Sequence, residues 1–186
     1  MKTIRIISNK LKFVFRRIYR TLNVKKSSDY VWKELIKFHK ISGWNFGQFD
    51  VDKHIECSFK VDESNIVNFN YAISNEKLNF RATILQYFDE ERTNDILVLA
   101  SHFNGLLNFG VVKVSLKYNY VEFIYTRDLL IYSLYPGEIN SDTDTHFDLT
   151  SDCYWSFTNL IDTGDDPVFI FSELLRKKEE ENNTAN

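Results

Sequence analysis

Proline, glycine and cysteine are all scarce in this sequence. Two Pro and six Gly occur in 186 residues, so we expect short polar turns between the elements rather than flexible linkers. Two cysteines, Cys57 and Cys153, are too few for a disulfide framework in a chain of this size. Both fall on apolar faces, and we interpret them as reduced core thiols rather than as a disulfide or a nucleophile.

Long apolar runs are also missing. No segment reaches the roughly 20 apolar residues that a membrane-spanning helix needs. The apolar run near the N-terminus is broken by Lys10, Lys12, Arg16 and Arg17, which is atypical of a secretory signal. An Arg-rich, acid-free amphipathic start also resembles an organelle transit peptide, and this alternative stays open. Our default expectation is a cytoplasmic protein.

The sequence also lacks the common motifs of catalysis and of ligand binding. The sequence has no Gly-rich phosphate loop, no Gly-x-Ser-x-Gly elbow and no Cys-x-x-Cys pair, and its four His residues lack metal-ligand spacing. We therefore predict no catalytic residue, no cofactor and no metal. An enzyme whose site is assembled from distant residues, such as Cys153 with His146, stays open because such partners meet only in the fold.

The composition is otherwise that of a folded chain with an uneven charge. Hydrophobic residues make up 44% and aromatic residues 16%, enough for a sizeable core. Residues 1–26 hold nine Lys or Arg and no acidic residue, whereas the other 160 residues hold 14 basic and 26 acidic ones. A basic arm of charge +9 on a body of charge −12 points to an anionic surface or an intramolecular contact.

The basic arm has the pattern of an amphipathic helix over residues 4–22. Its basic face could lie on an anionic membrane with its apolar residues in the interface. It could equally be the first helix of the domain, buried along its apolar stripe. Nucleic acid ranks below both, since the acidic body would repel phosphate. The candidate membrane or partner residues are Lys10, Lys12, Phe13, Phe15, Arg16, Arg17, Ile18, Arg20 and Leu22.

Helical spacing gives way to alternation after the first quarter of the chain. A second helix is predicted at roughly 29–42, capped by Ser27, Ser28 and Asp29 and ended by Gly43. Three segments, 55–61, 67–73 and 78–84, then alternate apolar and polar residues between short polar turns. This pattern predicts an antiparallel three-stranded meander with one buried face.

The second half of the chain alternates helices with a hairpin. A helix over about 96–108 follows the acidic residues 89–91, and a hairpin turns near Tyr118-Asn119. Residues 129–135 are either a short strand or a loop. Helices are predicted over 145–161 and from Pro167 after Asp166, ahead of a disordered tail over 179–186.

The fold class that follows is α+β, in the order α-α-βββ-α-ββ-α-α, with helices packed on one face of an antiparallel sheet. We divide the chain into the arm (1–26), a single domain (27–178) and the tail (179–186).

A resemblance to a known family rests on residues 94–161. It is carried by the helix end His102-Phe103-Asn104-Gly105-Leu106-Leu107-Asn108-Phe109-Gly110, then by Val111-Val112-Lys113-Val114, Val121-Glu122-Phe123-Ile124-Tyr125 and Leu129-Leu130. In these packing and turn positions the chain resembles the YbjN family, whose fold is similar to that of the type III secretion chaperones. The resemblance implies a small, dimeric domain that binds protein partners, and it implies no catalytic residue.

One local cluster has the residue types of a metal site. Asp142, Asp144, His146 and Asp148 alternate along the sequence, and carboxylates with an imidazole could hold Ca²⁺ or Mg²⁺. The glycine and the final glutamate of a calcium-binding EF-hand loop are missing, however. We favour the other interpretation, an acidic loop before the N-terminus of the following helix.

The leading functional hypothesis is therefore a non-enzymatic, protein-binding or regulatory module of the YbjN or secretion-chaperone type. Its partner would be another protein or a second copy of itself in a homodimer. The alternative is a peripheral membrane protein anchored by the arm.

Overall fold

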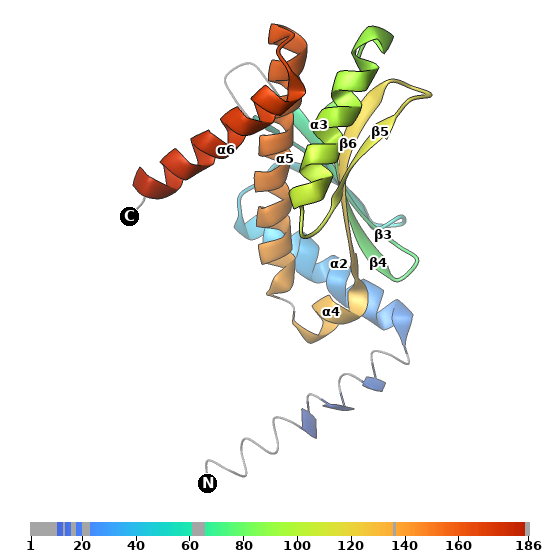
Figure 1. Ribbon diagram of the computed structural model, residues 1–186. Coiled ribbons are helices and arrows are strands. Elements are labelled where there is room, and N and C mark those ends of the chain that lie inside the picture. The colour runs from blue at the N-terminus through green and yellow to red at the C-terminus, as the bar shows by residue number, and fades with distance from the viewer. Residues whose placement is uncertain are drawn as a thin grey trace. The chain divides into compact units, whose positions relative to one another are not determined.

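The structure is a computed structural model that describes residues 11–12, 14–15, 18–19, 23–60, 66–135 and 137–184 (Figure 1). The predicted α+β class is confirmed, because five α-helices accompany a six-stranded antiparallel sheet in the described residues. The strands lie in the order β1-β2-β3-β4-β6-β5. The elements are α2 (Val24–Ile41), β1 (Phe46–Phe49), β2 (His54–Lys60), β3 (Ile66–Ser74), β4 (Lys77–Leu85), η1 (Glu90–Arg92), α3 (Thr93–Leu106), β5 (Val111–Ser115), β6 (Tyr120–Asp128), α4 (Leu129–Leu134), α5 (Glu138–Thr163) and α6 (Pro167–Thr184).

The meander and the hairpin form where alternation placed them. Strands β2, β3 and β4 cover the three alternating segments, and β5 and β6 form the hairpin. Asn75 and Glu76, between β3 and β4, both have positive φ angles of 49° and 63°, the backbone of a two-residue turn that suits the twist of a hairpin. The predicted turn between β2 and β3 lies outside the described residues.

One strand was not predicted. The four residues of β1 pair antiparallel with β2, with Phe46 opposite Cys57 and Phe49 opposite His54. Three of the four residues are exposed, because β1 forms an edge of the sheet. A strand so short and so exposed has no clear alternation to signal it.

Two helix starts differ from the prediction, and one helix was not predicted. Helix α2 begins at Val24 rather than near Asp29, since the side chain of Asn23 accepts a hydrogen bond from the Lys26 N–H at 3.3 Å. Residues 129–134, expected to be strand or loop, form α4, with Asp128 as the cap. Helix α5 begins at Glu138 rather than near Thr145.

The last helix begins as predicted and ends later. The Asp166 carboxylate accepts hydrogen bonds from the N–H groups of Val168 and Phe169 at 2.8 and 3.3 Å, and Pro167 takes the first helical position. Helix α6 then continues to Thr184, so the expectation of a disordered tail is wrong for residues 179–184. Arg176 explains part of this extension, since it pairs with Glu173 at 2.7 Å and with Glu180 at 2.6 Å.

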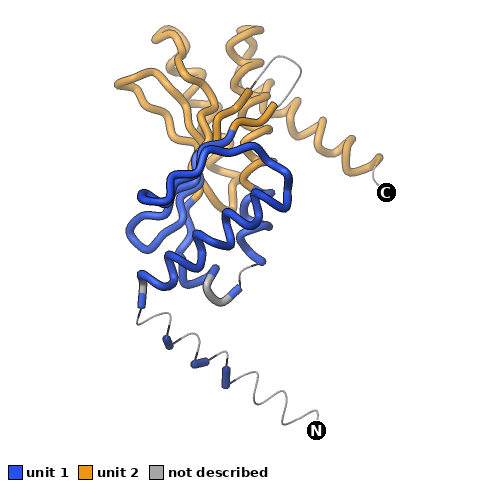
Figure 2. The backbone as a smooth tube through the Cα atoms, turned by 180° about the vertical axis from the view of Figure 1, so that it is seen from behind, with its two compact units in different colours: residues 1–57, 70–80, 126–145 blue, residues 58–69, 81–125, 146–186 orange. Residues whose placement is uncertain are grey.

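The chain forms two compact units. Unit 1 comprises residues 1–57, 70–80 and 126–145, and unit 2 comprises residues 58–69, 81–125 and 146–186 (Figure 2). The division follows no linker, because its boundaries fall inside β2, β3, β4, β6 and α5. A single domain over 27–178 therefore stays a prediction.

The core of unit 1 is an aromatic cluster around a buried histidine of α2. The His39 ring lies 5.1 Å from Tyr71, 5.2 Å from Trp44 and 5.2 Å from Phe46 between centroids. Its Nδ1 atom lies 2.8 Å from the carbonyl oxygen of Leu35. Helix α2 thus packs on the apolar face of β3, as the sequence predicts.

The core of unit 2 joins three helices to the sheet. Helices α3, α5 and α6 contribute Phe103, Phe157 and Phe171, and β6 contributes Phe123. His146 of α5 is 1% exposed and stacks on Phe123 at 5.1 Å. Cys153 is buried beside them, and both cysteines are free, as expected of core thiols.

The end of α3 is fastened to the edge strand β5. The Asn104 amide donates to the Val112 carbonyl at 3.0 Å and accepts from the Val112 N–H at 2.8 Å. In an antiparallel sheet, the N–H and C=O groups of one residue point toward the same side of its strand. The Asn104 side chain bonds to both groups of Val112 and therefore covers part of the open edge of the sheet. Gly110 is required between them, since its φ is 82° and a Cβ there would lie 2.6 Å from Phe123.

Buried His146 should make the protein acid-sensitive. Burial lowers its pKa from 6.5 to about 3, against a hydrogen bond to the Phe123 backbone that raises it. The unfolded chain therefore takes up a proton first, and stability falls as pH drops from 6.5 towards 3. At about pH 5 this group alone should reduce the free energy of unfolding by about 2 kcal/mol. The lowered pKa of His39, caused by burial, acts in the same direction.

The measurement is urea unfolding at several pH values for the wild type and His146→Leu. The variant should show a shallower loss of stability between neutral and acidic pH, whatever its absolute stability. If the free energy of unfolding falls equally with pH in both proteins, His146 is not the group that causes the acid sensitivity.

Candidate functional site

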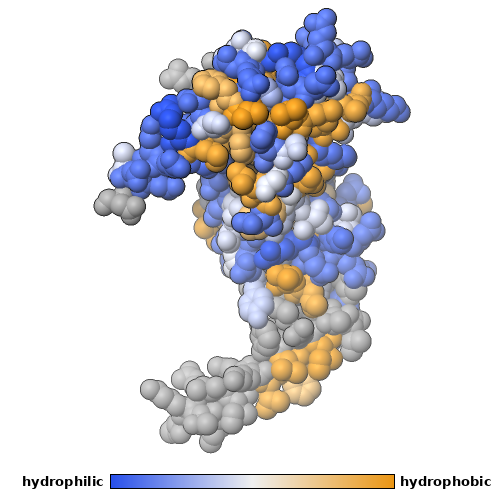
Figure 3. Space-filling model, viewed as in Figure 1, coloured by the Kyte–Doolittle hydropathy of each residue, from blue (hydrophilic) through white to orange (hydrophobic). Residues whose placement is uncertain are grey.

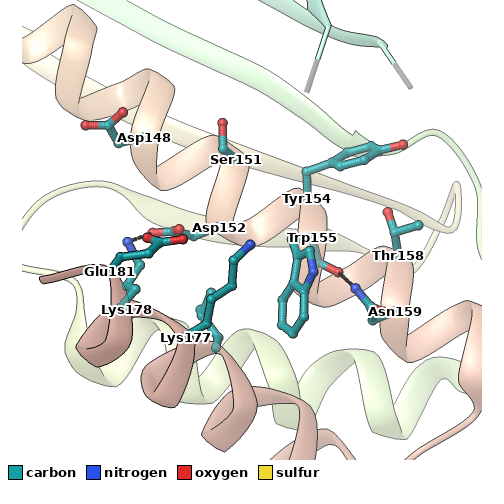
Figure 4. A pocket seen from close by; sticks show the side chains of 11 residues that line it. Asp148, Ser151, Asp152, Tyr154, Trp155, Thr158, Asn159, Lys177, Lys178 and Glu181 are labelled. Carbon is teal, nitrogen blue, oxygen red and sulfur yellow. Dashed lines mark hydrogen bonds and ion pairs between the residues drawn. The ribbon is translucent and has the colours of Figure 1, made fainter. Parts of the chain in front are cut away.

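A groove in unit 2 is a concave surface lined by described residues. It has a volume of about 570 Å³ and runs between α5 and α6 (Figure 4). Its walls combine carboxylates, ammonium groups and one indole. The residues that matter for its chemistry are Asp148, Asp152 and Trp155 of α5 and Lys177, Lys178 and Glu181 of α6.

The two-faced sequence of α5 creates one wall of this groove. Buried side chains recur along the helix every three or four residues, at Thr150, Cys153, Phe157 and Leu160, so they share one face. Asp148, Asp152 and Trp155 repeat with the same spacing on the outward face. Burial of the first face in the core therefore turns the two carboxylates toward the groove, while Trp155 stays partly buried against the core.

Helix α6 supplies the opposite wall in the same way. Ile170, Phe171 and Leu174 are buried in the core of unit 2, and Leu174 also lines the groove. One turn further on, Lys177, Lys178 and Glu181 extend along the groove, as Figure 4 shows.

An ion pair joins the two walls. Lys178 Nζ lies 2.6 Å from Asp152 Oδ2, and the side chains are 42% and 17% exposed. The pKa of Asp152 is raised, first by burial and further by the nearby Asp148 and Glu181 carboxylates, although Lys178 lowers it. Three carboxylates and two lysines therefore line the same groove.

The indole of Trp155 is the aromatic part of the groove. Lys177 Nζ lies 5.4 Å from the ring centroid, within the range of a cation–π contact. Asn159 donates its side-chain amide to the Trp155 carbonyl at 2.7 Å. Lys177 itself is exposed.

The titratable groups of the core do not favour catalysis. Burial raises the pKa of Cys153 well above its usual value and that of Cys57 to about 12. Burial lowers the pKa of His146 to about 3. Both shifts oppose the thiolate–imidazolium pair that a Cys–His site needs. Across the described ranges, no three His, Cys, Asp or Glu residues are placed to hold a metal ion.

The cluster from Asp142 to Asp148 is helical, which corrects the acidic-loop interpretation. All of it lies within α5, so its side chains point in different directions. Asp142 belongs to unit 1, where it accepts a hydrogen bond from Tyr132 at 2.7 Å and pairs with Arg127 at 3.2 Å. His146 enters the core and Asp148 lines the groove.

Asp142 should contribute to stability rather than to binding. Asp142→Asn removes the negative charge beside the Arg127 guanidinium and should lower the free energy of unfolding by about 1–3 kcal/mol. Asp162→Asn, at an exposed position of the same helix, should change it by less than about 0.5 kcal/mol. Urea unfolding at neutral pH measures both. If the two substitutions change the free energy of unfolding equally, Asp142 has no special structural role.

The structure describes few of the predicted arm residues. Lys12, Phe15 and Ile18 have helical backbone, whereas Lys10, Phe13, Arg16, Arg17, Arg20 and Leu22 lie outside the described residues. Phe15 is 68% exposed and Ile18 is 51% exposed. The described part of the arm forms an exposed hydrophobic strip at the bottom of Figure 3. A binding role for the arm stays a prediction.

The groove residues were missed by sequence reasoning. A signal was present, because Asp148, Asp152, Trp155 and Asn159 recur at helical spacing. The helix predicted over 145–161 contains all four residues, but its outward face was not recognised as one wall of a groove. The facing residues of α6 had no sequence signal, since only the fold brings the two helices together.

Comparison with known proteins identifies the fold. No family model and no curated protein matches the sequence. Among solved structures, YbjN from E. coli, described as a candidate transcription regulator, aligns with a TM-score of 0.50 and 7% identity over 66% of this chain and 87% of YbjN. The chain is similar in fold to YbjN. This confirms the resemblance expected from the sequence, at the level of the fold.

Two further structures align more weakly. The ExsC–ExsE complex gives a TM-score of 0.48 at 14% identity, over 72% of this chain and 95% of the matched chain. The Yersinia pestis type III secretion chaperone SycH, in complex with a fragment of YscM2, gives a TM-score of 0.38 at 12% identity, over 64% of this chain and 98% of the matched chain.

Within the described ranges, no helix has the length and apolar content needed to cross a membrane.

Proposed function

We propose that this protein is a non-enzymatic protein-binding module whose contact surface is the α5–α6 groove. The observation that carries this proposal is Trp155, a partly buried indole that lines the groove among charged side chains of both signs. Tryptophan is enriched among the residues that dominate binding energy at protein interfaces. Charged groups around such an anchor favour one partner over others by complementary pairing.

The shape of the groove supports a polypeptide ligand over a small molecule. Asp148, Lys177 and Glu181 are all exposed, so the groove is a surface trough and not an enclosed cavity. Pockets for small molecules bury most of the ligand surface and are mainly apolar. A trough between two helices instead suits a peptide segment or a third helix.

The fold and the charge agree with this proposal. The similarity to YbjN, described as a candidate transcription regulator, suits a regulator that acts through protein contacts. Direct binding to nucleic acid is disfavoured by the acidic body, because α5 alone carries Glu138, Asp142, Asp144, Asp148, Asp152 and Asp162 without a single Lys or Arg. Self-association as a homodimer and a cytoplasmic location remain part of the proposal.

The test is affinity capture from cells of the source organism. Trp155→Glu should lose partners that the wild type captures, because it places a charge at the centre of the contact. Tyr87→Glu makes the same kind of change at an aromatic residue that is 64% exposed outside the groove, and should keep them. The proposal is overturned if the two variants retain the same partners, or if the wild type captures none.

The alternative function is attachment to an anionic membrane through the arm, which the fold similarity does not support. The observation that keeps it in view is the exposure of Phe15 and Ile18 beside basic residues. If it holds, full-length protein floats with vesicles of phosphatidylserine and phosphatidylcholine, and Phe15→Glu with Ile18→Glu abolishes flotation. Val51→Glu, at a position 96% exposed, is the matched control. Wild-type protein that stays at the bottom of the gradient removes the alternative.

A further inference from the structure

The outward face of α2 carries a straight row of lysines. Lys26, Lys33, Lys37 and Lys40 follow one another at spacings of seven, four and three residues, and all four are exposed. Since an α-helix has 3.6 residues per turn, the four fall within a sector of about 60° and extend over about 21 Å of the helix. Lys26 also contacts the Tyr19 hydroxyl. With five lysines and two acidic residues, α2 has the opposite charge balance to α5.

The core of unit 1 fixes the position of this lysine row. Val31, Leu35 and His39 of the same helix are fully buried. At helical spacing they lie on the side opposite to the lysines. Rotation of α2 about its axis would pull these three side chains out of a close-packed core. The lysine row is therefore a fixed feature of the surface of unit 1.

Two carboxylates close to the lysine row have their direct partners outside it. Asp29 pairs with Lys53 at 2.5 Å, and Asp50 accepts a hydrogen bond from the Trp32 indole at 3.0 Å. Both carboxylates interact with lysines of the row through charge alone. They therefore offset part of its positive charge without holding its side chains.

The row itself has little ion pairing. Glu34 lies 4.0 Å from Lys37, at the outer limit of a salt bridge. Lys33 and Lys40 form no ion pair among the described residues. Like charges three or four residues apart on one helix repel each other and destabilise it. An anionic partner that lies along α2 would remove this repulsion.

The spacing of the row matches that of a second helix. Lys26, Lys33 and Lys40 are each seven residues apart, which places them about 10.5 Å from one another along the axis. Carboxylates that recur every seven residues on another helix have the same separation, because the rise per residue is the same. Ile41, which is 75% exposed, lies beside the row at its C-terminal end and offers an apolar contact.

A lipid surface fits α2 less well than a helix does. Helices that bind at a membrane interface bury their apolar face among the lipids. The apolar face of α2 is instead occupied in the core of unit 1, where it packs on β3. Charged residues that face each other across a pair of helices set the choice and orientation of the partner, and this kind of recognition needs only the exposed face.

We propose that the lysine row of α2 binds an acidic amphipathic helix of a partner protein. The partner helix lies along α2, with its carboxylates against the four lysines and an apolar side chain against Ile41. The contact uses none of the residues of the α5–α6 groove, so this inference goes beyond the proposed function and does not depend on it.

Fluorescence anisotropy with the full chain and two labelled helical peptides tests the spacing. Both peptides are built on alanine and glutamine and have the same composition. One carries its glutamates at alternating spacings of three and four residues, so that they form a row, and the other spreads them around the helix. The wild type should bind the first at least about fivefold more tightly at an ionic strength of about 0.01 M, and added salt should weaken this binding.

Charge reversal tests the residues. Lys33→Glu with Lys37→Glu should bind the glutamate-row peptide at least about fivefold more weakly than the wild type. The same variant should bind a peptide with lysines in place of the glutamates more tightly than the wild type does, which also shows that it is folded. Lys60→Glu with Lys77→Glu makes an equal charge change at exposed positions and should keep the affinity for the glutamate-row peptide.

Other results overturn the inference. Equal affinity for the two glutamate peptides would make the row a general anionic contact, and no binding of either would make it a solvated face. Wild-type protein that ignores the peptides but floats with phosphatidylserine vesicles, with flotation lost in Lys33→Glu with Lys37→Glu, would assign the row to lipid. Trp155→Glu should bind the glutamate-row peptide as the wild type does, so failure of the groove and failure of the row are distinguishable.

Discussion

The burial of one face of α5 is the constraint on which both the core of unit 2 and the groove depend. Cys153, Phe157 and Leu160 enter the core together with His146, and this fixes the rotation of the helix about its axis. Fixing the rotation directs Asp148 and Asp152 into the groove and places Trp155, partly buried, at the edge of the core. Because protein cores are close-packed, a helix held this way has little freedom to turn. The surface chemistry is thus a consequence of the core.

Helix α5 contains no Lys or Arg, so basic residues of other elements pair with its carboxylates. In unit 1, Arg127 at the end of β6 pairs with both Glu138 and Asp142. In unit 2, Lys178 of α6 pairs with Asp152. Asp148 lies between these two points along α5 and has no ion pair among the described residues. Basic residues of other elements therefore offset part of the acidity of α5.

Sequence reasoning succeeded where one face of an element is buried and the other is solvated. Strands β2, β3 and β4 follow from alternation because side-chain direction in a strand has a period of two. It failed where local preference and tertiary contacts disagree. Asp142, Thr143 and Asp144 have poor helix propensity and read as a loop, yet Asp142 bonded to Arg127 and Thr143 buried in unit 1 hold them in α5. The edge strand β1 depends on its pairing with β2, which no local pattern records.

By itself, the sequence determined the α+β class, the meander, the hairpin, the last helix start and the contrast between a basic arm and an acidic body. Each of these depends on residue type and spacing within a short stretch of chain. The tertiary structure alone decided that Trp155 faces Lys177 across a groove, that Asn104 covers the edge at Val112, and that His146 is buried neutral. These depend on elements far apart in the sequence meeting in space, and packing rather than local preference sets which side chains meet.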